Sequence, residues 1–192
     1  MKRFCRTLCF LIRWSAIMSV LRLTAKLLAE IADQPSPDSI AEPSPLGDWY
    51  GHVFTIERRK CVMFVNEPTL FVGPALGVVK AEYRQIVPFF LGVLTQALRT
   101  MGFSAKEVDW ILGKHKDIAI GRATNRSTLG SLNNRVADAK AHFAWDGGLD
   151  ICDIGSITKW LNETPMKPIG YSNGLEQMRS VVEKGTASLE ES

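Results

Sequence analysis

The first third of the chain carries short apolar runs that alternate with polar residues or end at turn residues. Residues 19–23 alternate, and residues 49–56 are rich in aromatic and β-branched side chains, which is typical of strands. Residues 61–65 are apolar at every position, as in a strand buried on both faces. The charged segment 57–60 between these two runs predicts a hairpin. Residues 69–79 form a poorer third run, because glycine and proline interrupt it.

Later in the chain the apolar positions follow a helical period, with one further strand-like run at 117–122. Helices are predicted at residues 25–32, 82–101, 105–112, 136–145 and 175–184, with another ending near Asn162. Ser104 and Glu107 have the spacing of a capping box, and Thr24 is expected to cap the first helix. Asp150 or Asp153 is expected to cap the helix that ends near Asn162.

Most strands precede most helices, and this order favours an α+β fold over a doubly wound α/β fold. We expect a mostly antiparallel sheet of four to five strands with helices packed on one face. A single domain is predicted for residues 18–184, with a Pro-rich loop at 33–46. Residues 1–17 form a leader, and residues 185–192 are expected to be a disordered tail.

The 192 residues are 46% hydrophobic and 22% charged, as in a globular domain. The net charge of +3 comes from the leader, which contains four of the 23 basic residues and no acidic one. The remainder has 19 basic and 20 acidic residues, a net charge of −1. The domain therefore lacks a strong nucleic-acid footprint.

Three interpretations of the leader are open. Arg6 and Arg13 interrupt its apolar region, which is unfavourable for a signal peptide. The apolar region is too short for a transmembrane helix, which needs about 20 residues. We favour an upstream translation start, with the domain beginning at Met18, over a role in export or surface anchoring.

The four cysteines, Cys5, Cys9, Cys61 and Cys152, show no disulfide framework and no zinc spacing. They favour the cytoplasm. No histidine belongs to a metal motif such as His-Glu-x-x-His. We therefore expect no metal, no cofactor and no transmembrane segment.

The most polar stretch is residues 124–133, between the last predicted strand and the helix at 136–145. Thr124, Asn125, Arg126 and Ser127 can bind a phosphate or carboxylate where a loop enters a helix. Alternatively, Ser127 or Thr128 caps the helix and Asn125 adopts a turn. The spacing of a nucleotide P-loop is missing.

Further ligand-binding candidates lie elsewhere in the chain. Arg58 and Arg59 lie at the hairpin tip, either as a phosphate contact or as a solvated turn. Asn66 lies in the next turn, and Asn133 continues the polar helix face. His52 lies in a strand, where a core or rim position with one hydrogen bond competes with a role as general base. The other candidates are less specific: His115 follows a helix end, which favours a cation, and His142 lies beside a core position.

Several blocks resemble those of a small bacterial domain of unknown function, domain of unknown function 6933. They are Gly47–Tyr50, Arg58–Lys60, Phe64–Glu67, Thr124–Asn133 and Thr164–Tyr171. The resemblance covers about residues 20–182 and leaves out the leader. It implies a fold and no chemistry, because the family has no assigned activity.

Two functions remain open. The first is a small binding or interaction module with a polar and basic site at a helix N-terminus, whose partner is another protein or an anionic ligand. The alternative is an enzyme or toxin that acts on a phosphate-bearing substrate, either a nucleotide or RNA. No catalytic residue can be assigned from the sequence.

Overall fold

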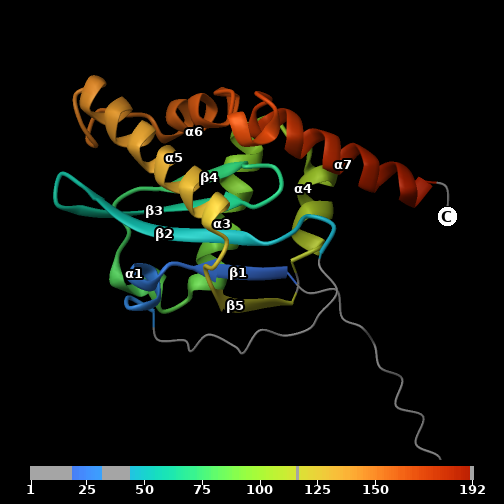
Figure 1. Cartoon of the computed structure of the whole chain (residues 1–192), viewed down its shortest axis with the longest axis horizontal. Helices are drawn as coiled ribbons and strands as arrows, with labels where there is room; N and C mark the ends of the chain where they lie inside the picture. The colour runs from blue at the N-terminus through green and yellow to red at the C-terminus, as the bar shows by residue number, and fades with distance from the viewer. Residues whose placement is uncertain (1–18, 32–43, 116, 191–192) are drawn as a thin grey trace, which may run out of the picture.

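The computed structural model describes residues 19–31, 44–115 and 117–190. The leader and most of the Pro-rich loop lie outside these residues. Figure 1 shows the strands and helices in chain order.

Five strands form one sheet in the order β4-β3-β2-β1-β5. The strands are β1 (Ser19–Leu23), β2 (Trp49–Ile56), β3 (Arg59–Asn66), β4 (Val72–Ala75) and β5 (Ile118–Arg122). β2, β3 and β4 are antiparallel neighbours, whereas β1 is parallel to both β2 and β5. The predicted α+β class and strand number are confirmed, but the sheet is mixed.

The β2–β3 hairpin is continuous from Trp49 opposite Asn66 to Ile56 opposite Arg59. Only Glu57 and Arg58 separate the paired ends, and both have positive φ angles, 46° and 66°. A two-residue loop with two left-handed residues matches the right-handed twist of the strands. The hairpin expected from the two strand-like runs is therefore present, with its turn inside the charged segment 57–60.

Helices cover both faces of the sheet rather than one (Figure 1). They are α1 (Ala25–Leu28), α2 (Lys80–Tyr83), α3 (Ile86–Thr100), α4 (Ala105–Gly113), α5 (Arg126–Trp145), α6 (Ile154–Glu163) and α7 (Gly174–Glu190). Alternation along β3 explains this arrangement: Val62 and Phe64 join one core, and Cys61, Met63 and Val65 join the other. A strand apolar at every position needs cover on both sides.

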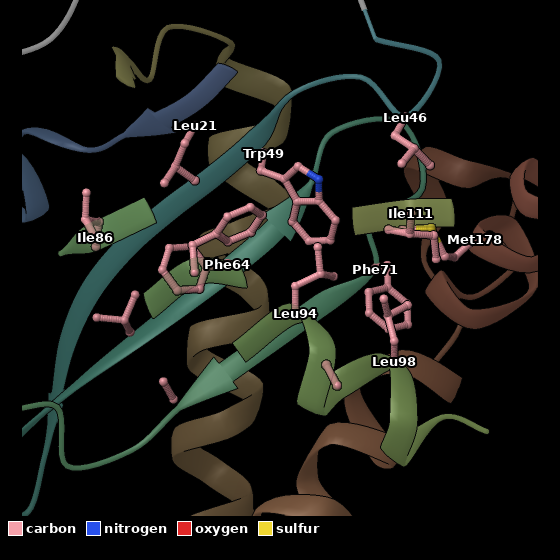
Figure 2. Close-up of a cluster of buried hydrophobic side chains, with 14 of the residues drawn as sticks. Leu21, Leu46, Trp49, Phe64, Phe71, Ile86, Leu94, Leu98, Ile111 and Met178 are labelled. Atoms are coloured by element: carbon pink, nitrogen blue, oxygen red, sulfur yellow. The ribbon is translucent and has the colours of Figure 1, made fainter. Parts of the chain in front are cut away.

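The first core lies between the sheet and α3, with contributions from α1, α4 and α7. Figure 2 shows Trp49 and Phe64 of the sheet facing the leucines of α3. The ring of Phe90 lies 5.1 Å from that of Phe64 and 5.2 Å from that of Trp49, in tilted geometries that aromatic pairs favour. The second core lies between the sheet and α5 and α6.

Four helices differ from the prediction in their bounds. α1 ends at Leu28, four residues before the predicted end at 32. The helix expected at 82–101 is divided into α2 and α3 at Gln85, whose φ and ψ are −129° and 56°. α5 begins at Arg126, ten residues before the predicted start at 136. α7 continues to Glu190, into the segment predicted to be a tail. In the described part of the chain, no helix has the length and apolarity needed to cross a membrane.

Candidate functional site

The N-terminus of α5 is closed by side chains of the protein itself. Asn125 is the N-cap, and its Oδ1 accepts hydrogen bonds from the backbone N–H groups of Ser127 at 2.9 Å and Thr128 at 3.3 Å. Its Nδ2 donates to Oε1 of Glu67 at 2.6 Å. Thr128 Oγ1 lies 3.5 Å from the same carboxylate oxygen. Glu67 therefore supplies the negative charge that a helix N-terminus favours.

The remaining residues of this polar stretch face solvent. Thr124, Arg126 and Ser127 are exposed. Within the described residues, Arg126 has no ion pair and no side-chain hydrogen bond. It is thus not buried against a structural carboxylate of the described residues.

The hairpin tip contacts the other end of α5. Arg59 forms a two-pronged ion pair with Asp150, at 2.5 and 3.0 Å, between exposed side chains. Glu57 Oε2 accepts a hydrogen bond from the backbone N–H of Leu149 at 3.2 Å. The 20 residues of α5 span about 30 Å, so Arg126 and the hairpin tip do not open onto one cleft.

Asn66 has a structural role in the turn between β3 and β4. It is fully buried, and its Nδ2 donates to the carbonyl of Leu46 at 2.8 Å. Its Oδ1 accepts from the hydroxyl of Thr69 at 2.7 Å and from the Thr69 backbone N–H at 3.3 Å. These hydrogen bonds hold the turn in place, and the buried side chain of Asn66 does not face a ligand in solvent.

The structure brings His52 and Asn133 together in one groove. The groove lies over β2, between α1 and α5, and has a volume of about 680 Å³. Its charged lining residues are Lys26, Glu30, Lys60 and Lys140. This size falls within the range of small-molecule sites, and its lining is far more polar than is usual for them.

The charges in the groove are unbalanced. Lys60 Nζ lies 2.6 Å from Glu30 Oε2, so these two charges offset each other. Lys26 and Lys140 have no carboxylate partner among the residues that the structure describes. The two free ammonium groups face the same space from opposite walls, α1 and α5.

The positive charge of the groove affects the pKa of His52. Its Nδ1 shares a 3.0 Å hydrogen bond with Oγ1 of Thr24, which therefore bonds to His52 and not to the N-terminus of α1. Burial lowers the pKa of His52, and the charges of Lys26 and Lys140 lower that pKa further. At neutral pH the imidazole is uncharged, and its Nε2 has no hydrogen-bond partner among the described residues.

The sequence alone did not identify Lys26 and Lys140 as site residues. Lys140 follows Asn133 by seven residues, which places both on one face of a helix. That spacing is a usable signal once α5 is known to include both residues. Lys26 has no comparable signal, because its position depends on how α1 packs beside β2.

A second cavity, of about 350 Å³, lies between β4, α3 and α6. Its lining is mostly apolar and includes Phe89, Val93 and Ile154. It contains none of the residues predicted as ligand contacts. Of these two cavities, the polar groove is the one that contains residues predicted from the sequence as ligand contacts, His52 and Asn133.

Comparison with known proteins identifies the family. The family model described as Domain of unknown function (DUF6933) matches residues 20–177. No curated protein matches the sequence. The matched segment runs from β1 into α7 and includes His52, Asn133, Lys26 and Lys140. The resemblance inferred from the sequence blocks is thus confirmed, and the chain belongs to this family of domains of unknown function.

Proposed function

We propose that the protein is a small binding module that holds a phosphate-bearing anion in the groove between α1 and α5. The observation that carries this proposal is the pair of unpartnered ammonium groups, Lys26 and Lys140, on opposite walls of one polar groove. Phosphate oxygens are strong acceptors for such donors. His52 and Asn133 add neutral groups that can hydrogen-bond the rest of the ligand.

The groove is a better anion site than the N-terminus of α5. At that N-terminus Glu67 already accepts the Asn125 hydrogen bond and would repel a second anion. Thr124, Arg126 and Ser127 remain candidates for contacts at the rim, as do Arg58 and Arg59 at the hairpin tip. They do not share a cavity with the lysines.

A binding role is favoured over catalysis by the described lining of the groove. Its carboxylate, Glu30, is paired with Lys60. The alternative, an enzyme or toxin acting on a nucleotide or RNA, is favoured by one observation, the uncharged His52 with a free Nε2.

We infer a cytoplasmic location, which is supported by the free thiols of Cys61 and Cys152.

Calorimetric titration of the full chain with ATP and with inorganic pyrophosphate tests the proposal. Lys140→Ala should weaken binding by about tenfold or more, because a charged hydrogen bond is worth about 1.5–3 kcal/mol. Lys140 is exposed on a helix, so alanine should leave the fold intact. Lys159→Ala, which removes an exposed lysine of α6 outside the groove, is the matched control and should change affinity less than twofold.

Three results decide between the functions. Saturable binding that is lost in Lys140→Ala, with ATP recovered unchanged, supports a binding module. Conversion of ATP that stops in His52→Gln supports the enzyme. Absence of binding at low salt, or equal losses in Lys140→Ala and Lys159→Ala, contradicts the groove as the site.

A further inference from the structure

A cluster of three metal-ligating side chains lies where α5 ends and α6 begins, away from the groove. His142 is in the last turn of α5, Asp146 is its C-cap, and Cys152 lies just before Asp153, the N-cap of α6. One ligand atom from each residue, a ring nitrogen of His142, a carboxylate oxygen of Asp146 and Cys152 Sγ, lies within 4.8 Å of the others. All three residues are half-buried.

Two of the three separations between these atoms are close to those of a tetrahedral zinc site. Bonds of about 2.0 Å to N or O and about 2.3 Å to S place N and O about 3.3 Å apart, and S and O about 3.5 Å apart. His142 Nε2 lies 3.3 Å from Asp146 Oδ2, and Cys152 Sγ lies 3.7 Å from the same oxygen. The third separation, between the His142 ring and Cys152 Sγ, is within 4.8 Å, so closing on an ion requires these two groups to approach each other.

The imidazole of His142 is held in place but lacks a hydrogen bond at Nε2. Its ring stacks on Trp160 of α6, with centroids 4.9 Å apart and planes 4° from parallel. Nε2 is buried and makes no hydrogen bond within the described structure, although Asp146 Oδ2 lies 3.3 Å away. A buried ring nitrogen without a partner needs an explanation, and a metal ion supplies one.

The backbone between the helices returns Cys152 to the end of α5. Gly147 and Gly148 have φ angles of 89° and 106°, a conformation that favours glycine. Asp153 does not join the cluster through its carboxylate, because that group caps α6 by accepting from Ser156 N at 2.8 Å. The triad thus provides three ligands from one short segment.

We propose that His142, Asp146 and Cys152 bind one zinc ion. Imidazole, carboxylate and thiolate are the ligand types that zinc accepts, and three protein ligands leave the fourth tetrahedral position open to water or an external ligand. This site reverses the expectation of no metal. The spacing His-x-x-x-Asp-x-x-x-x-x-Cys matches no zinc motif considered in the sequence, so only the turn between α5 and α6 reveals it.

Titration of the full chain with Co²⁺, followed by displacement with Zn²⁺, tests this site. Cys5→Ser and Cys9→Ser are present in every sample, so that the leader contributes no thiolate. We expect one equivalent of Co²⁺ to produce a thiolate-to-cobalt charge-transfer band that Zn²⁺ removes. Cys152→Ser should abolish this band, and Asp146→Asn should weaken Zn²⁺ binding by at least about 100-fold, more than loss of a residue that only orients a ligand.

Asp150→Asn is the matched control, because Asp150 is a neighbouring exposed carboxylate outside the triad. It should change Zn²⁺ affinity less than twofold. Circular dichroism of each metal-free variant establishes that it is folded. The proposal is overturned if the parent shows no thiolate band, if the band persists in Cys152→Ser, or if Asp146→Asn and Asp150→Asn bind Zn²⁺ equally.

Discussion

His115 forms a buried polar network at the end of α4, and the network fixes its protonation. Trp49 Nε1 donates to His115 Nε2 at 3.2 Å, so Nε2 is an acceptor and the ring proton resides on Nδ1. Nδ1 then donates to Ser19 Oγ at 2.8 Å, and Ser19 donates to the Lys114 carbonyl at 3.3 Å. The sequence suggested a cation favoured by the helix end. Burial prevails over that effect and keeps the imidazole neutral.

His115 should make the protein less stable in mild acid. Burial lowers its pKa from 6.5 to about 4. Below pH 6.5 the imidazole is protonated in the unfolded chain but stays neutral in the folded one. The free energy of unfolding is therefore highest above pH 6.5 and decreases as the pH falls toward 4. The loss attributable to His115 is about 3 kcal/mol.

An NMR titration of the imidazole measures the pKa of His115. Urea unfolding at about pH 7 and about pH 4.5 measures the decrease in the free energy of unfolding. A His115 resonance that titrates near the ordinary value of 6.5 would show that the ring is not held neutral in the core.

At the scale of elements, α5 connects the predicted loop with both candidate sites. Its N-terminus is capped by Asn125, its middle lines the groove, and its C-terminus carries the metal triad. Because the helix is anchored at Asn125 and Glu67, we expect stability and ligand binding to respond separately to changes along it.

Two neighbouring substitutions should separate the cap from the exposed arginine. Asn125→Ala removes the side-chain bonds to the first turn and to Glu67, and should lower the unfolding free energy by about 1 kcal/mol. Arg126→Ala changes an exposed side chain and should alter the unfolding free energy by less than about 0.5 kcal/mol. Urea unfolding of both variants measures this difference, and equal losses would mean that the cap contributes nothing of its own.

Local patterns predicted several elements well, for physical reasons that lie within a few residues. The capping box is present, with Ser104 Oγ accepting from Glu107 N at 3.3 Å and Glu107 Oε2 accepting from Ser104 N at 2.7 Å. Asp153, one of the two expected caps of α6, accepts from Ser156 N. Such signals depend on residues three apart and need no tertiary information.

The start of α5 was missed because its buried side includes polar residues. Thr128, Ser131 and Arg135 are buried, so the apolar period that marks a helix is weak there. Arg135 follows two asparagines in the sequence, yet it is buried, and its Nη2 donates to the Thr164 carbonyl at 2.9 Å. Asn162 likewise bonds both the N–H and the C=O of Val72 in β4, at 2.8 and 2.9 Å, across 90 residues of sequence.

At the scale of the whole molecule, chain order did not reveal how the strands pair. β1 is parallel to both β2 and β5; α1 precedes β2 in the chain, and α2 to α4 precede β5. The helices of both connections pack on one face of the sheet, and α5 and α6, which follow β5, cover the other. The groove depends on the same topology, since Lys26, His52 and Lys140 come from three separate elements.

The central claim is that the groove, and not the N-terminus of α5, binds a phosphate-bearing anion. The most direct measurement is an NMR titration of the full chain with ATP that follows the His52 imidazole and the backbone amides of Arg126 and Ser127. An anion between Lys26 and Lys140 would offset the charges that lower the His52 pKa, so that pKa should rise as ATP saturates. The buried His115 should not change. An unchanged His52 pKa, with shifts confined to Arg126 and Ser127, would contradict the account.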